Sequence, residues 1–116
     1  MKDNSEKDTA RVLHILDAIT EIESFLKGVD YTAFEKSSLL QSACIRQLEI
    51  IGEAASHISD ASKKNVSDIG WREITGLRNI LIHEYFGIDI RLVWEIIMKD
   101  IPSFKTKIEQ LLSSLS

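Results

Sequence analysis

The stretch Trp71–Tyr85, WREITGLRNILIHEY, decides the fold that we expect for this chain. Its apolar residues recur at spacings of three and four. In an α-helix this spacing brings Ile74, Leu77 and Leu81 within about 60 degrees of one another on one side. Gly87 follows closely, and glycine commonly stands just past a helix end. The stretch therefore predicts an amphipathic helix from about Trp71 to about Tyr85, with one face buried.

The same helix also carries a polar band. With Arg78 set at zero degrees, Asn79 and His83 fall at about 100 and 140 degrees. Tyr85 falls at about −20 degrees, beneath Arg78. Ile80, at about 200 degrees, lies outside the core stripe, so the helix is apolar on two sides. A helix that is apolar on two sides usually packs against two surfaces. We expect the first to be the core of the same chain and the second to be a partner subunit.

Helical patterns continue on both sides of this stretch, with no alternating strand pattern and no internal repeat. Upstream, we expect a helix from about Thr9 to Lys27, capped by Asp8 or Thr9 and ended by Gly28. A longer helix is predicted from about Ser37 to Ser59, with Gly52 inside it. Residues 28–36 and 59–70 are predicted to be connections.

Downstream, Asp89 is expected to cap a fourth helix and Asp100 a fifth, with Pro102 in the first turn of the fifth. Short connections favour antiparallel neighbours. We therefore predict one all-α domain over residues 1–116, an up-down bundle of four to five helices with a flexible segment at residues 1–8. A domain this small buries a modest fraction of its surface, so dimerisation would help its stability.

The composition limits the possible functions. The net charge is −4, whereas a protein that grips a long stretch of nucleic acid is usually basic. Any contact with nucleic acid should therefore be local. Cys44 is the only cysteine, so no internal disulfide can form and a reducing cytoplasm is expected. We also expect no signal peptide and no membrane span.

The polar band suits phosphoryl chemistry on RNA. Arg78 offers a fork of donors for a phosphate, and His83 can exchange a proton near neutral pH. Metal-free cleavage needs a base, a cation and an acid. One histidine and one arginine cannot easily fill all three roles, but a two-fold dimer would supply a second histidine and a second arginine. His14 and His57 lack the spacing of metal ligands, so we expect no metal and no cofactor.

RNILIHEY, residues 78–85, resembles the Arg-x4-6-His signature of HEPN domains. The tyrosine two residues after the histidine makes it similar to the HepT branch of that superfamily. Three flanking blocks resemble the same family: IRQLEIIGEA at 45–54, GWREITGLRN at 70–79 and YFGIDIRLVWEIIMKDIP at 85–102. The resemblance covers nearly the whole chain.

The resemblance implies a helical bundle that dimerises with its two motifs facing each other across a cleft. It implies a metal-independent endoribonuclease, the toxin of a toxin–antitoxin pair, with tRNA or mRNA as substrate in some members. It also implies a partner, the minimal nucleotidyltransferase antitoxin MntA, which transfers AMP to the motif tyrosine. Carried over to this chain, Arg78 and His83 would be catalytic, Tyr85 the modified residue and a possible substrate contact, and Asn79 an orienting residue.

The sequence allows two interpretations of Glu53. It lies on the polar face of its helix, either as a cleft residue that positions His83 or Arg78, or as an ordinary surface carboxylate. Two other functions stay open beside the ribonuclease. One is a non-catalytic nucleotide-binding or assembly partner of a nucleotidyltransferase, and the other is a purely structural helical dimer.

Overall fold

The computed structural model describes the backbone of residues 2–83 and 87–115, and the side chains of residues 5–77 and 87–115. Within these residues every regular element is a helix, which confirms the predicted all-α class. In chain order the elements are α1 (Lys2–Phe25), α2 (Tyr31–Glu35), α3 (Ser38–Ser56), α4 (Asp60–Lys63), the 3-10 turn η1 (Lys64–Val66), α5 (Trp71–His83), α6 (Ile90–Glu95), the π-helical turn η2 (Ile96–Asp100) and α7 (Ile101–Leu115).

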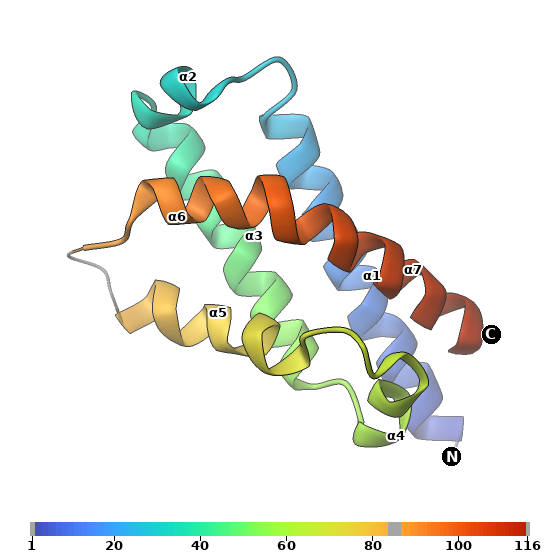
Figure 1. Cartoon of the computed structure of the whole chain (residues 1–116). Coiled ribbons are helices and arrows are strands. Elements are labelled where there is room, and N and C mark those ends of the chain that lie inside the picture. The colour runs from blue at the N-terminus through green and yellow to red at the C-terminus, as the bar shows by residue number, and fades with distance from the viewer. Residues whose placement is uncertain (1, 84–86, 116) are drawn as a thin grey trace.

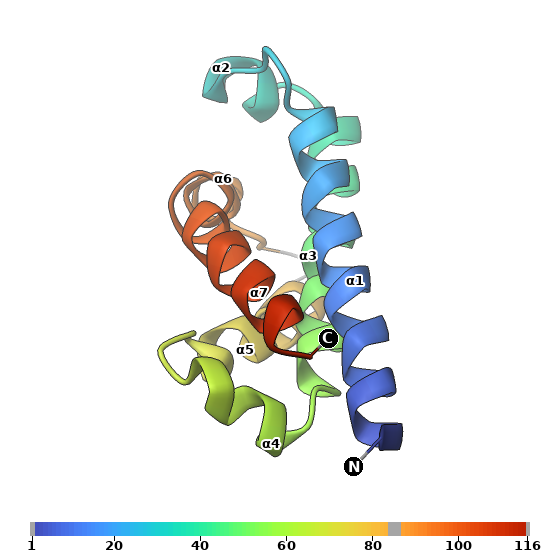
Figure 2. The same cartoon turned by 90° about the vertical axis from the view of Figure 1, so that its right-hand side faces the viewer.

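The helices form two layers, as Figures 1 and 2 show. The antiparallel helices α1 and α3 make one layer, and α5 together with the rod α6–η2–α7 makes the other. The two chain ends lie side by side, and the Ser5 hydroxyl donates to the Leu115 carbonyl at 3.4 Å. A stripe of buried apolar residues along α1 forms much of the core: Val12, Ile15, Ile19, Ile22 and Leu26.

The predicted start of the first helix is wrong. Helix α1 begins at Lys2, so Asp8 lies inside the helix and caps nothing there. The Asp8 side chain is only 2% exposed. It accepts hydrogen bonds from the backbone N–H of Ser59 at 2.9 Å and from the hydroxyls of Ser59 and Ser62. These distant partners, which cannot be seen in the local sequence, fix the N-terminal end of α1 against α4.

Both predicted connections contain short helices. Asp30 caps α2 by accepting from the N–H of Ala33 at 2.9 Å, and α2 carries the fully buried Phe34. The Ser59 hydroxyl caps α4 by accepting from the N–H of Ser62 at 3.3 Å. Helix α3 therefore ends at Ser56, earlier than predicted, because the chain must turn before Ser59 begins the next helix.

The predicted break between a fourth and a fifth helix is also wrong. Asp89 caps α6 as expected, but Asp100 caps nothing, and the chain runs helically from α6 into α7 (Figure 1). The N–H of Ile101 bonds to the carbonyl of Ile96, five residues earlier, which is the π-helical pattern. Pro102 would press on the carbonyl four residues before it in a regular helix. The wider π turn just upstream relieves that contact, so the helix continues through Pro102 without the predicted break.

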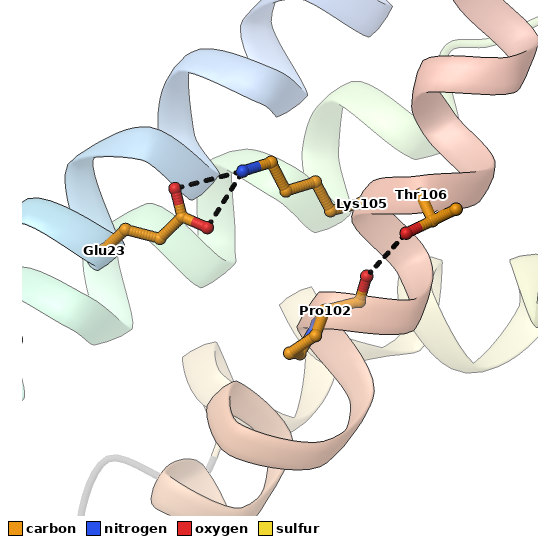
Figure 3. Close-up of polar contacts among 4 residues, drawn as sticks. All are labelled: Glu23, Pro102, Lys105 and Thr106. Atoms are coloured by element: carbon orange, nitrogen blue, oxygen red, sulfur yellow. Dashed lines mark hydrogen bonds and ion pairs between the residues drawn. The ribbon is translucent and has the colours of Figure 1, made fainter.

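Helix α7 is fastened to α1 by the pair drawn in Figure 3. Lys105 Nζ lies 3.0 and 3.2 Å from the two carboxylate oxygens of Glu23. One turn earlier, the carbonyl of Pro102 accepts from the hydroxyl of Thr106 at 3.3 Å. None of the helices in the described residues is long and apolar enough to cross a membrane.

Candidate functional site on helix α5

The first turn of α5 is held on three sides. The indole N–H of Trp71 donates to the carbonyl of Val66 at 3.2 Å, and its ring meets Phe104 edge-on with centroids 6.4 Å apart. Lys107 Nζ bonds both the carbonyl and the carboxylate of Asp68, at 3.0 and 3.2 Å. The start of the helix is therefore fixed to α7 and η1.

The chain is anchored again just beyond the motif. The Asp89 carboxylate accepts from the N–H of Leu92 at 3.2 Å and starts α6. Trp94 packs on Phe34 of α2, with ring centroids 5.1 Å apart, and Arg91 lies over the Tyr31 ring at 4.8 Å. The motif therefore lies between two fixed points of the fold.

Three predicted site residues belong to the second half of α5. Arg78, Asn79 and His83 are helical, and α5 ends at His83, but their side chains lie outside the described part of the structure. Tyr85 lies outside the described residues altogether. The predicted core side of the helix is confirmed where side chains are described, because Ile74 and Leu77 are buried.

Glu53 lies on α3, which packs against α5. Its carboxylate is 49% exposed and bonds His57 Nε2 at 3.1 Å, and the imidazole is 51% exposed. The sequence reasoning missed this partner, although a spacing of four residues on one helix could have revealed it. Gly52, the residue before Glu53, is buried in α3.

His14 is exposed, and within the described residues no group of three or more histidine, cysteine or acidic side chains could hold a metal. Cys44 is fully buried, and burial raises the pKa of its thiol to about 11, so it is protonated at neutral pH. Trp71 and Trp94 are partly buried, and both pack against the core.

A cavity of about 550 Å³ opens between α5 and α7. Its floor is apolar and includes Ile74, Leu77 and Phe104, and its rim carries charges of both signs, among them Glu73 and Lys99. It borders the first half of α5, whereas the motif occupies the second half. The described lining offers neither a cluster of cations nor a catalytic pair.

Comparison with known proteins adds to this geometry. The family model described as "Ribonuclease HepT-like" matches residues 15–111. The chain belongs to the HepT-like family. It is 41% identical to "Putative RNase MJ1380" of Methanocaldococcus jannaschii over 106 residues, covering 90% of this chain and 97% of that protein. It is 43% identical to "Probable ribonuclease HepT" of Thermococcus cleftensis over 97 residues, covering 84% and 88%.

A third relative is "Putative RNase TTE0752" of Caldanaerobacter subterraneus, 38% identical over 99 residues, covering 85% of this chain and 88% of that protein. No solved structure matches the chain. The HepT-like match confirms the resemblance found in the sequence, supports an enzyme of the ribonuclease class, and includes the whole of α5.

Proposed function

We propose that this HepT-like chain is the toxin of a toxin–antitoxin pair, a metal-independent endoribonuclease that works as a homodimer in the cytoplasm. The observation that carries the proposal is the register of α5 within a HepT-like chain. Ile74 and Leu77 are buried, so helical geometry assigns Asn79 and His83 to the opposite side of the helix. We propose that this side faces the substrate.

The proposed reaction uses the ribose 2′-OH as nucleophile. His83 accepts its proton, the 2′-oxygen attacks the adjacent phosphorus, and Arg78 stabilises the negative charge that builds up. The bond from phosphorus to the 5′-oxygen breaks, and an imidazolium protonates the leaving oxygen. The products are a 2′,3′-cyclic phosphate and a 5′-hydroxyl, so the step needs no metal ion.

The helical register supports a composite site. In helical register Arg78 and His83 are about 140 degrees apart on α5, so either the arginine reaches across to the histidine or the other subunit completes the site, and we favour the second arrangement. A two-fold axis that brings two motifs together would let the arginine of one subunit serve the histidine of the other. The RNA substrate, a tRNA or an mRNA, would bind in the cleft between the two motifs.

Tyr85 is the proposed control point. A nucleotidyltransferase antitoxin like MntA would catalyse attack of the Tyr85 oxygen on the α-phosphorus of ATP, forming a phosphodiester to AMP and releasing pyrophosphate. In helical register Tyr85 falls about 20 degrees from Arg78. The added phosphate would then occupy the cation needed for RNA.

Asn79 and Glu53 are proposed as orienting residues. Asn79 precedes His83 by one helical turn and can hydrogen-bond the histidine or the substrate. Glu53 belongs to the helix on which α5 packs, and its carboxylate can position a cationic side chain. The alternative function, a non-catalytic nucleotide-binding or assembly partner of a nucleotidyltransferase, predicts binding without cleavage.

A cleavage assay in EDTA tests the catalytic proposal. The purified chain is incubated with RNA beside His83→Ala and Arg78→Ala, with melting temperature as a folding control. We expect wild type alone to cut and to leave 2′,3′-cyclic phosphate ends. Intact RNA with wild type, or equal cutting by His83→Ala, would contradict the assignment.

Mass spectrometry tests the control point. The chain is co-expressed with a minimal nucleotidyltransferase of the MntA type, and its intact mass is compared with that of Tyr85→Phe. We expect a shift by one or more AMP units in wild type only, together with loss of RNA cleavage. An active nucleotidyltransferase that leaves the mass unchanged would remove Tyr85 as the control point.

A further inference from the structure

One face of α5 extends beyond the motif. In helical register Arg72 and Gly76 fall at about 120 and 160 degrees, beside Asn79 and His83 at about 100 and 140 degrees. The backbone is α-helical through all four positions. We call these four residues the motif face. It lies on the side of α5 away from the buried Ile74 and Leu77.

Arg72 brings an available positive charge to this face. Its side chain is exposed, and no carboxylate in the described part of the chain pairs with it. Lys63 Nζ lies 5.5 Å from the centroid of the Trp71 ring, and Trp71 precedes Arg72 in the chain. The Glu73 carboxylate is directed toward the start of α5, within 2.9 Å of where a Gly70 Cβ would stand.

Gly76 is costly to the helix, and the described side chains leave room for a larger residue there. Glycine is the poorest helix former after proline. A Cβ placed on Gly76 would have no described atom within 4 Å, apart from the local backbone. Among the described residues, packing therefore does not require glycine at this position, and close approach of a ligand would give a reason for it.

We propose that the motif face is the track along which single-stranded RNA lies on its way to His83. Arg72 binds a phosphate upstream of the scissile one, and Gly76 lets the strand come close to the helix. The two ends of the track, Arg72 and His83, are about 16 Å apart along the axis, more than one nucleotide. This inference rests on the proposed ribonuclease function and explains how an acidic chain attracts RNA locally.

RNA fits this face better than a second protein surface does. The four positions carry an arginine, a glycine, an asparagine and a histidine, which offer charge and hydrogen bonds to a phosphodiester strand. The central part of a subunit interface is depleted in charge and enriched in large apolar side chains. None of the four positions supplies such a side chain, and the apolar Ile80 falls at the edge of the face.

Binding of a strand that cannot be cleaved tests the track. The probe is a fluorescent single-stranded oligoribonucleotide with 2′-O-methyl groups, followed by anisotropy at several salt concentrations. For Arg72→Ala we expect Kd to rise about 10-fold, and the salt slope of log Kd to fall by about 0.7. Arg72→Lys should recover part of the affinity. Lys27→Ala, which removes an exposed charge beyond the far end of α1, should leave both values unchanged.

Gly76→Ala separates an RNA contact from a structural role. Alanine should keep or raise the melting temperature, because it favours the helix, yet it should raise Kd for the probe several-fold. Unchanged affinity in both Arg72→Ala and Gly76→Ala would overturn the track. Conversion of a wild-type dimer to a monomer by Gly76→Ala, seen by light scattering, would identify the face as a subunit interface and would also overturn it.

The outcomes for the track and for catalysis can be told apart. Wild type that cuts ordinary RNA, while the variants bind the methylated strand equally well, refutes the track alone. Wild type that binds the methylated strand through Arg72 but cuts no RNA refutes the proposed enzyme alone. The methylated strand lacks the free 2′-hydroxyl, so its binding reports nothing of the chemical step.

Discussion

At the scale of single residues, Asp8 shows how a buried charge links two distant parts of the chain. Burial raises the pKa of this carboxyl, but hydrogen bonds from Ser59 and Ser62, with the charge of Lys63, outweigh burial and lower the pKa below its ordinary value of 3.8. The charged form is therefore favoured in the folded state. Asp8 stabilises the fold above about pH 4, and this contribution is lost as the pH falls through the lower folded-state pKa.

Asp8→Ala should destabilise the protein by about 3 kcal/mol at pH 7, since it removes charge-assisted hydrogen bonds and leaves the Ser59 N–H without its acceptor. Below pH 4 the difference between variant and wild type should shrink. Urea unfolding at pH 7 and at pH 3 measures both effects. Glu6→Gln, at an exposed carboxylate two residues before Asp8 on α1, should change stability by less than about 0.5 kcal/mol. A penalty for Asp8→Ala that is equal at both pH values would show that the charge of Asp8 does not contribute.

Glu53 offers a second test at the scale of a residue, because its known partner can be removed separately. If Glu53 orients the proposed catalytic groups, Glu53→Gln should lower kcat about 10-fold with little change in KM. His57→Ala should leave kcat unchanged. Both side chains are about half exposed, so neither change should move the melting temperature much. Equal activity in Glu53→Gln and wild type would establish Glu53 as a surface carboxylate.

At the scale of elements, the rod from α6 to α7 carries a proline inside a helix. Pro102 is exposed and contributes no N–H, and the π turn before it makes room for its ring. Pro102→Ala should therefore stabilise the protein by about 1 kcal/mol, less than the full proline cost of about 3 kcal/mol because the π turn already absorbs part of it. Thermal unfolding beside Ser103→Ala, an exposed neighbour, measures the difference. A loss of stability in Pro102→Ala would mean that the proline fixes the rod rather than strains it.

The elements also show what sequence patterns can and cannot predict. The stripes of α1, α3 and α5 were predictable because burial imposes a three-four spacing over many residues. The short helices α2 and α4 were missed because their few residues carry no periodicity, and only the caps Asp30 and Ser59 mark them. The continuous rod was missed because an Asp before Pro normally starts a helix, and the π turn that accommodates the proline leaves no sequence signature.

The candidate site also has features that the sequence predicts and features that it does not. The motif helix and its buried side could be derived from spacing alone, and family resemblance pointed to Arg78 and His83 as the chemical groups. The Glu53–His57 pair required only the i, i+4 rule on α3. The contact between Lys107 and Asp68 could not be predicted from the sequence, since it joins segments that are 39 residues apart.

At the scale of the whole molecule, small size and exposed apolar groups favour assembly. The two layers bury a single core, yet Leu39 is 78% exposed at the start of α3, and other large apolar side chains are partly exposed. A chain of 116 residues gains stability when a partner covers such surface. The composite site proposed above also requires a second subunit, because it takes Arg78 and His83 from different subunits.

Mixing two inactive variants tests that composite site directly. Arg78→Ala keeps His83, and His83→Ala keeps Arg78, so a mixed dimer would contain one complete site if the two groups meet across the interface. After exchange at equal concentrations about half of the dimers are mixed, and each has one working site of two, so RNA cleavage should recover to about a quarter of the wild-type rate. Mixing either variant with the double variant gives no complete site and serves as the control. If each site instead lies within one subunit, every combination stays inactive, and wild type mixed with the double variant should then lose activity only in proportion to its dilution.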